Sequence, residues 1–391
     1  MSRVYLDHAA TTPTHPAVLE EMKPYFTSQY GNASSVHQLG RQARVAVEDA
    51  RERVAACLGA ESSEIVFTSG GTEADNLALK GILAAASTNG SPAGLVTSAA
   101  EHEAILEPAR HLEALGHPVT VLSPAAHGAV TPAQVAEAIG EDTALVSLMH
   151  TNNETGVRTD VAGVAEVCSA HDVLFHCDAV QAAGLYDLDV DALGVDLLSL
   201  SGHKFYGPKG TGVLVVRGGL DLGPLVEGGS QERERRGGTE NVPGVVGLAE
   251  ALDRATDRAA ELHDRLRSLQ RRLIDGLDAA VPGEYVLNTP LGDHQTAPHV
   301  VNVAFPPRDG DPMDGEMLIL NLDMEGVCAS AGSACQSGAL EPSHVLQALG
   351  LERETAAAAL RFSMGAQTSD EDVDYALETL QTTLQRMQSL G

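Results

Sequence analysis

Three short segments place side chains with distinct chemistry at the ends of apolar runs. In FTSGGTE a strand pattern passes through small residues into a helix pattern, so backbone N–H groups and the hydroxyls of Ser69 and Thr72 would meet at a helix N-terminus, which favours phosphate binding. The run DVLFHC is followed by Asp178, whose carboxylate could hold a proton on a cationic ring nitrogen. The run DLLSL leads to Lys204, where desolvation favours the neutral amine that forms Schiff bases.

Together the three segments supply an anion site, a pyridinium partner and an amine, the parts that a pyridoxal 5′-phosphate site requires. Each has a simpler explanation when taken alone. Gly-Thr-Glu is a common helix start, Asp178 could cap the Ala-rich helix pattern that follows it, and Lys204 could be a surface lysine. The other lysines favour Lys204 as the amine, because Lys23 and Lys80 lie in helix patterns and Lys209 lies in a Gly/Pro loop.

Four further residues have types and surroundings that suit a catalytic site. His102 follows the run GLVTS and could stack on a planar cofactor or transfer protons, although a lone histidine is more often structural. Asn153 follows the run ALVSLM, where a turn residue bonded to its own backbone is the alternative. Cys335 lies in SAGSACQSG, whose small residues favour a mobile loop with an accessible thiol over burial. Arg361 could bind a substrate carboxylate in a bidentate way or form a surface ion pair.

The composition limits the classes of partner. Asp and Glu number 54 against 25 Lys and Arg, and the formal charge of −29 disfavours binding to nucleic acid or to anionic lipid. No stretch of 18 apolar residues and no apolar signal segment is present, so we expect a cytoplasmic protein that does not cross a membrane. Five widely spaced cysteines without a Cys-x-x-Cys pair favour reduced thiols over a disulfide framework or a metal site.

The elements that must position these residues are β-rich runs alternating with helix patterns between residues 64 and 217. Several of the seven runs are apolar on successive residues, as in strands buried on both faces of a sheet. We therefore predict an α/β fold: a mainly parallel seven-stranded sheet with helices on both faces. The last two runs are separated only by SGHKFYGPKGTG, which is too short for a helical crossover and predicts one antiparallel pair.

A second, α+β pattern follows the sheet. From Gly244 onward, leucines at helical spacing predict one long connecting helix, and the runs HVVNVAF, GVCASA and LRFSM are three shorter strand candidates before a final amphipathic helix. We predict a large cofactor-binding domain over residues 16–255. Residues 1–15 and 256–391 would form a smaller domain that carries the mobile cysteine loop. The charged segment QERERRGG between them most simply predicts a solvated loop, although an arginine there could meet an acidic partner.

Long motifs in this chain resemble one family. YLDHAATTP, SGHKFYGPKG, EPSHVL and LRFSMG occur in order from one end to the other, and in these the chain resembles the cysteine desulfurases that feed iron–sulfur cluster assembly. These enzymes belong to the class V aminotransferase family and have the type I fold of pyridoxal phosphate enzymes. One departure is Cys328, seven residues before Cys335, where a non-thiol residue is expected. It could be a second, resolving thiol or simply a buried one.

The resemblance implies roles for the matching residues. Lys204 would form the Schiff base with pyridoxal 5′-phosphate, Asp178 would pair with the pyridine nitrogen, and Gln181 would bond the ring hydroxyl. His102 would stack on the ring and, with Lys204 and Cys335, count among the catalytic residues. The matching phosphate ligands are Gly71, Thr72, Ser201, His203 and, from the other subunit of a homodimer, Thr239. The substrate carboxylate would be held by Asn153, also matched as a cofactor contact, by Arg361 and by Asn32.

The implied reaction converts L-cysteine into L-alanine and leaves a persulfide on Cys335 for transfer to iron–sulfur cluster assembly or to thiolation acceptors. The implied partners are a second copy of the chain and a sulfur acceptor such as an iron–sulfur scaffold protein, in whose complex Cys335 would be a transient iron–sulfur ligand. A selenocysteine lyase or another class V aminotransferase-type enzyme is the alternative with the same cofactor residues. A non-catalytic sulfur-transfer scaffold is a more remote alternative.

Overall fold

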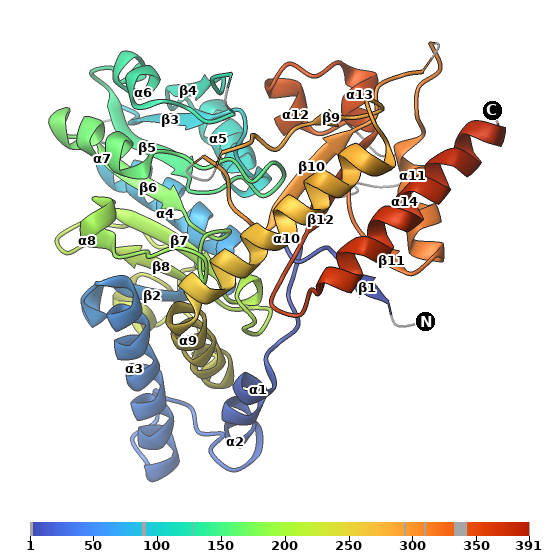
Figure 1. Cartoon of the computed structure of the whole chain (residues 1–391). Helices are drawn as coiled ribbons and strands as arrows, with labels where there is room; N and C mark the ends of the chain where they lie inside the picture. The colour runs from blue at the N-terminus through green and yellow to red at the C-terminus, as the bar shows by residue number, and fades with distance from the viewer. Residues whose placement is uncertain are drawn as a thin grey trace.

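The large sheet is the centre of the structure, a computed structural model that describes residues 3–87, 91–126, 128–292, 295–308, 310–331 and 342–390, the side chains of 388–390 excepted. The strand order is β2-β8-β7-β6-β5-β3-β4 (Figure 1). The strands are β2 (Ile65–Thr68), β3 (Gly94–Ser98), β4 (Val119–Leu122), β5 (Thr143–Met149), β6 (Leu174–Asp178), β7 (Leu197–Ser201) and β8 (Gly212–Val216). Strands β3 to β7 are parallel, and β8 is antiparallel to both of its neighbours. The predicted seven-stranded sheet and its antiparallel pair of β7 and β8 are confirmed, while the second antiparallel pair, of β2 and β8, was not predicted.

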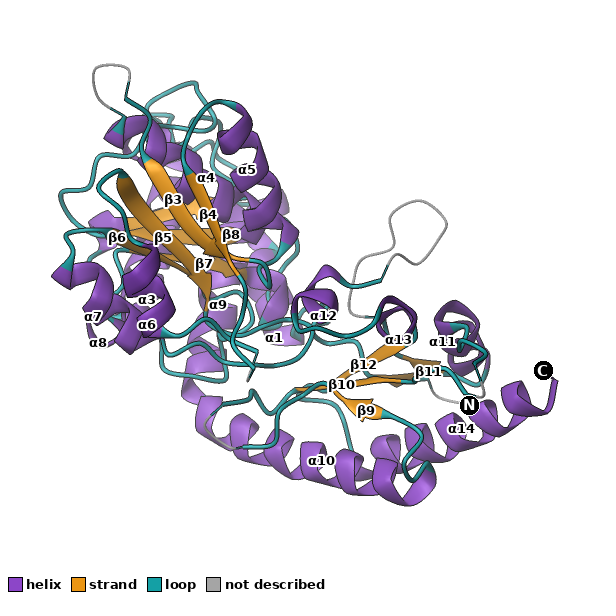
Figure 2. Ribbon diagram, turned by 90° about the horizontal axis from the view of Figure 1, so that it is seen from above, coloured by secondary structure: helices purple, strands orange, loops and turns teal. Residues whose placement is uncertain are grey.

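Helices cover both faces of this sheet, as Figure 2 shows. On one face, α4 (Gly71–Ala86) and α5 (Glu103–Ala114) share an apolar core with Leu145 of β5, Leu174 of β6 and Leu197 of β7. The larger core on the other face includes residues of helices before, between and after the strands. These helices are α1 (Pro16–Met22), α3 (Gln38–Leu58), α6 (Pro132–Ala138), α7 (Val161–Ala170), α8 (Val190–Leu193) and α9 (Val242–Asp257), and the short α2 (Pro24–Thr27) follows α1.

A separate apolar core holds the C-terminal elements together with the first strand. Strands β12 (Ala359–Ser363), β10 (Val300–Ala304) and β9 (Val286–Leu287) form an antiparallel sheet, and β1 (Val4–Tyr5) pairs in parallel with β11 (Val327–Cys328). Helices α10 (Ala259–Ala280), α11 (Gly315–Met324) and α14 (Asp370–Leu390) supply leucines to this core. The short helices α12 (His344–Ala348) and α13 (Arg353–Ala357) precede β12.

The structure also departs from the sequence predictions elsewhere. The predicted single long helix is two helices, because the backbone of Arg258 leaves the helical conformation between α9 and α10. The two-residue strands β1 and β9 were not predicted. The charged segment after residue 230 is not a fully solvated loop: the Glu232 side chain is 4% exposed, and its carboxylate accepts two hydrogen bonds from Arg51, at 2.8 and 2.9 Å.

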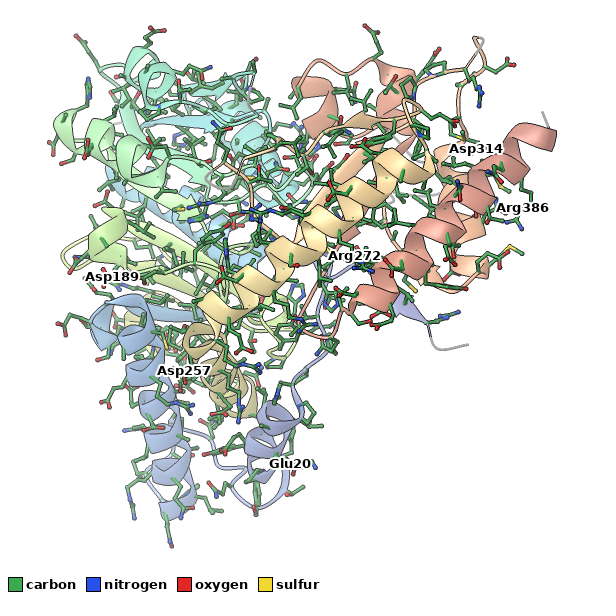
Figure 3. All side chains as sticks on the ribbon, in the orientation of Figure 1. Glu20, Asp189, Asp257, Arg272, Asp314 and Arg386 are labelled. Atoms are coloured by element: carbon green, nitrogen blue, oxygen red, sulfur yellow. The ribbon has the colours of Figure 1, made fainter. Side chains whose placement is uncertain are left out.

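The acidic composition appears on the outside of the molecule. Glu20, Asp257 and Asp314 lie on outer helices and connections and project away from the body (Figure 3). Within the described ranges, every helix is too short or too polar to cross a lipid bilayer.

Candidate active site

The carboxyl ends of β6 and β7 lie side by side and carry the predicted ring-nitrogen partner and the predicted amine. Asp178 ends β6, is 7% exposed, and pairs in register with Ser199 of β7. Its Oδ1 accepts a hydrogen bond of 2.9 Å from the N–H of Val180. Burial raises the pKa of Asp178, while that N–H group, His102 and Lys204 act in the opposite direction. A carboxylate so placed suits a buried cation as its partner.

Lys204 ends the short 3₁₀ turn Gly202–Lys204 that follows β7. Its Nζ donates hydrogen bonds to the carbonyl oxygens of Ala9 and Ala10, the latter at 2.9 Å. The pKa of Lys204 is lowered to about 8, first by burial and then by Arg361, against the opposite effects of Asp178 and Asp7. At pH 7, one unit below this pKa, about a tenth of the amine is therefore neutral and nucleophilic.

The N-terminal arm fixes the turn that carries Lys204. The Thr12 hydroxyl donates to the carbonyl oxygen of His203 at 2.8 Å and accepts from the N–H of Tyr206 at 2.8 Å. The hydroxyl of Thr11 lies 3.1 Å from Nδ1 of His203. The pKa of His203 is lowered to about 4 by burial and by two lysines, so its ring is neutral. If Thr11 donates to Nδ1, the ring proton is on Nε2, where it can be donated to an anion.

The predicted phosphate turn lies at the same sheet edge. Gly70 precedes α4 with φ of +156°, and no side chain caps the helix, so the first-turn N–H groups face outward at the positive end of the helix dipole. A Cβ on Gly71 would lie 2.8 Å from Cγ2 of Val180 and 3.4 Å from Cβ of Ser201. Only glycine therefore leaves this turn open beside the buried Ser201 hydroxyl. Thr72 begins the same turn and is exposed.

Gln181 and His102 flank Asp178 in different ways. The Gln181 Nε2 group donates to the carbonyl oxygen of Ala9 at 2.9 Å, and its Oε1 lies 3.3 Å from Nε2 of His299. His102 is the N-cap of α5, because its Nδ1 accepts from the N–H of Ala104 at 3.0 Å. The two alternatives weighed for His102 are thus compatible: Nδ1 caps the helix, and the proton on Nε2 stays available toward the site.

Arg361 lies at the centre of β12, and its side chain is 4% exposed. It donates to Oδ1 of Asp7 at 2.9 Å and to the carbonyl oxygen of Asn153 at 2.8 Å. Arg361 therefore forms a buried ion pair with Asp7 that faces the site, not a surface ion pair. The turn-forming role considered for Asn153 belongs to Asn152, whose Oδ1 accepts the N–H groups of Glu154 and Thr155, both at 2.9 Å.

The segment that contains Cys335 lies outside the described residues, but both of its ends are described and both lie at the site. Before the segment, Ser330 and Arg361 exchange backbone hydrogen bonds of 3.2 and 2.6 Å. After it, the Ser343 hydroxyl donates to Glu154, and Nε2 of His344 lies 2.9 Å from the carbonyl oxygen of Glu101. The residues that anchor the two ends are thus adjacent to or part of the predicted substrate and cofactor contacts.

Thr239 and Asn32 are the two site residues that the single chain does not bring to the others. Thr239 is exposed in the loop before α9, where Arg236 ties the loop to Glu73 of α4 at 2.9 Å. Asn32 is exposed between α2 and α3, and its Oδ1 accepts from the N–H of Ser34 at 2.8 Å.

Sequence reasoning missed several residues of the site. Asp7, Thr11 and Thr12 fall in the YLDHAATTP motif, which carries the family resemblance but received no individual roles. His299 contacts Gln181 from the C-terminal part of the chain, a distance in sequence that periodicity does not reveal.

Cys328 is half-buried at the end of β11, and burial and the nearby Asp323 raise its pKa, which makes it a poor thiolate.

Comparisons with known proteins agree along the whole chain. The profile of the class-V aminotransferases matches residues 4–376. A cysteine desulfurase IscS of Dictyoglomus turgidum is 43% identical over 388 residues, which are 99% of this chain and 96% of that protein. The solved structure of a NifS-like protein is 35% identical, with a TM-score of 0.90 over 98% of this chain and 100% of that one. A structure of SspA in complex with cysteine is 35% identical, with a TM-score of 0.79 over 93% of this chain and 99% of that one.

Proposed function

This chain belongs to the class-V aminotransferase family as a pyridoxal-phosphate-dependent cysteine desulfurase, and on that premise we propose which of its residues perform the reaction. Asp178, Gln181 and His102 surround the ring, Lys204 supplies the amine, and a turn at the start of α4 takes the phosphate. Arg361 and Asn153 bind the carboxylate of L-cysteine. Cys335 receives the sulfur. The observation that supports this assignment best is that both ends of the Cys335 segment are anchored beside Arg361, Glu154 and Glu101.

The described residues fit pyridoxal 5′-phosphate. The uncapped turn at Gly71 is open where a Cβ would block it, and the Ser201 hydroxyl borders it. The imidazole of His203, two residues after Ser201 and bonded to Thr11, would be a further donor for a phosphate. The carboxylate of Asp178 is the acceptor that a ring N–H requires. When bound, the cofactor supplies an electron sink for the pair released at the substrate Cα.

Lys204 has two tasks, and its surroundings serve both. Its lowered pKa keeps part of the amine neutral, as attack on a carbonyl carbon requires. The same amine, once free, can take the proton from the Cα of cysteine and return a proton to the alanine that forms. The carbonyl oxygens of Ala9 and Ala10 accept its N–H groups and hold Nζ at the sheet edge between these two tasks.

The substrate carboxylate would bind the guanidinium of Arg361, which already faces the site from a buried position. Asp7 holds that guanidinium at 2.9 Å, and the Asn153 carbonyl fixes a second nitrogen, so its plane is set before substrate arrives. Preorganisation of this kind lowers the entropy cost of orienting the substrate. The amide side chain of Asn153 would contact the carboxylate or the ring from the other side.

Cys335 would take the sulfur as a thiolate. A bond forms between the Cys335 sulfur and the substrate sulfur, the C–S bond of cysteine breaks, and the electron pair of that bond stays with carbon until a proton completes alanine. The enzyme is left with a persulfide, and no external oxidant or reductant is needed for this half of the cycle. Cys335 would take the sulfur from the substrate held by Arg361, and the same sulfur would then pass to an acceptor.

A homodimer would complete the site. Thr239 is exposed, which suits a contact with the phosphate in the second subunit. The acceptor would be a protein of iron–sulfur cluster assembly or thiolation, and the enzyme would act in the cytoplasm. The separate apolar cores support a division into residues 16–255 and a smaller domain of residues 1–15 and 256–391.

The test is the visible spectrum of the purified protein before and after L-cysteine, with alanine and sulfide measured in the presence of a reductant. The wild type should show a cofactor band that shifts and should form both products. Cys335→Ala should keep the band and its shift but lose sulfide release, whereas Cys328→Ala should keep all three. Sulfide release by Cys335→Ala would refute the nucleophile assignment, and a shifting band without sulfide from the wild type would point to transamination or other Cα chemistry.

A further inference from the structure

A row of polar side chains crosses the interior of the large sheet beneath α4. Ser147 of β5, His176 of β6 and Ser199 of β7 lie on the face that α4 covers, and all three are 0% exposed. On the same face one step toward the other end of these strands, the row is leucine, at positions 145, 174 and 197. The polar row therefore lies directly between the apolar core and the sheet edge that carries Asp178.

His176 joins this row through both ring nitrogens. Its Nδ1 lies 2.9 Å from the Ser147 hydroxyl, and its Nε2 lies 2.9 Å from the Ser199 hydroxyl. Burial lowers its pKa to about 3, so the ring is neutral and one nitrogen must accept while the other donates. No positive charge is therefore available from His176 for a neighbouring carboxylate.

Two carboxyl groups lie buried beside this row. Asp75, on α4, is 1% exposed, and its Oδ1 lies 3.7 Å from Nε2 of His176. Glu101, after β3, is 2% exposed, and its Oε1 accepts from the N–H of Met149 at 3.1 Å. One oxygen of each, Asp75 Oδ1 and Glu101 Oε2, is buried and has no hydrogen-bond partner among the residues that the structure describes.

Three carboxyl groups in one buried cluster cannot all be ionised, and the structure distinguishes them. Asp178 accepts a backbone N–H group and faces both Lys204 and His102, which favours its charged form. Burial and the Asp178 charge both raise the pKa of Asp75 and of Glu101 well above the usual value, and only a hydroxyl or one N–H group opposes that. The thiol of Cys177 lies on the opposite face of β6, where it is buried, and its pKa is also raised.

We propose that Asp75 and Glu101 are positioning residues held as neutral carboxylic acids, so that Asp178 is the single charged carboxylate of the cluster. This inference rests on the proposed role of Asp178 at the ring nitrogen and extends it. Because Asp75 and Glu101 are uncharged, the only negative charge of the three carboxyl groups is on Asp178. It lies at the sheet edge, where it would hold the ring proton. As neutral acids, Asp75 and Glu101 each carry a hydroxyl hydrogen. A buried carboxyl oxygen that carries this hydrogen can donate it to a neighbouring group.

Infrared difference spectroscopy tests the protonation state of these groups without reference to catalysis. The holoenzyme near neutral pH is compared with Asp75→Asn, with Glu101→Gln and with the control Asp160→Asn, which changes the exposed N-cap of α7. We expect each of the first two differences to show the loss of one carboxylic acid C=O band, and the control to show the loss of a carboxylate band. Loss of a carboxylate band from Asp75→Asn or Glu101→Gln would overturn the proposal for that residue.

Isotope labelling makes the test independent of whether the variants fold. Wild-type protein grown with ¹³C-carboxyl aspartate should show a carboxylic acid band at neutral pH that moves to lower frequency with the label. If every aspartate band that moves is a carboxylate band, the proposal for Asp75 is wrong. Both measurements are equally informative on protein that binds no cofactor, so failure of the proposed function would be recognised separately from failure of this inference.

The cofactor band supplies a second readout. In Asp75→Asn one neutral group replaces another, so the pH midpoint of the visible band should stay where it is in the wild type. If Asp75 were ionised, its removal would lower the pKa of Asp178 and move the midpoint. A displacement of about one pH unit or more would therefore overturn the proposal.

Discussion

The two faces of the large sheet differ although they are made by the same strands. On β6, Phe175 and Cys177 point into the core under α3, α7 and α9, which is apolar except where the buried Arg51–Glu232 ion pair lies against Phe67. On the face that α4 covers, His176 and Asp178 alternate with them and lead from an apolar layer through a polar row to the site. The side chains on the first face stabilise the fold. The second face buries fewer apolar side chains, and its polar side chains lead to the charged groups near the sheet edge.

The two faces of the sheet should differ most in how a single substitution affects activity and stability. The largest effect is expected at Lys204, at the sheet edge that carries the site. Lys204→Ala should reduce desulfurase activity by about 10⁴-fold, because the variant loses both the amine and the base. Its resistance to urea should not fall, since burial opposes the charge of Lys204 in the folded state. Alanine formation and the urea midpoint measure the two quantities.

Lys209→Ala is the matched control for that change. Lys209 lies five residues later and is exposed in the following loop, so its removal should leave both quantities near those of the wild type. Equal activity losses in the two variants would mean that the amine of the site is misassigned.

The opposite pattern is expected from the apolar face. Phe175→Ala removes a ring that is 0% exposed and should cost about 3–5 kcal/mol of unfolding free energy, while the folded fraction keeps its cofactor band. Phe26→Ala, at a side chain that is 60% exposed, is the control and should cost far less. Chemical denaturation followed by circular dichroism gives the free energies, and loss of the cofactor band from folded Phe175→Ala would contradict the separation of the two faces.

The sheet could be predicted from sequence because burial on both sides leaves long apolar runs that few other structures produce. The break at Arg258 could not, because the leucine spacing continues after it and neither Gly nor Pro marks it. Strand β9 has only two residues, Val286 and Leu287, and is defined by its pairing with β10. Such elements depend on tertiary partners rather than on their own pattern.

Site residues that follow a strand pattern could be predicted from the sequence. Residues whose contacts depend on the tertiary fold could not. Asn152 and Asn153 have the same side chain, and only the fold decides which one bonds its own turn. Glu232 lies in a charged run that predicts exposure, yet it is buried against Arg51. Asp75 lies in the second turn of α4, where a charged residue type in a helix pattern is ordinarily expected to face solvent, yet it is 1% exposed.

The smallest expected effect is on how the unfolding free energy falls as the pH is lowered. The slope of that fall should differ between variants of the two faces of the sheet. The pKa of His176 is lowered from 6.5 to about 3 by burial, so between these values the unfolded chain binds a proton that the folded chain does not. The stability contribution is complete above pH 6.5 and is lost as pH falls, at about 1.4 kcal/mol per pH unit for one group. His176→Gln should therefore flatten the fall in unfolding free energy by this amount, while Phe175→Ala should shift the whole curve without changing its slope. Urea unfolding at several pH values between about 4.5 and 6.5 measures both, and parallel curves for His176→Gln and the wild type would show that His176 is not held neutral.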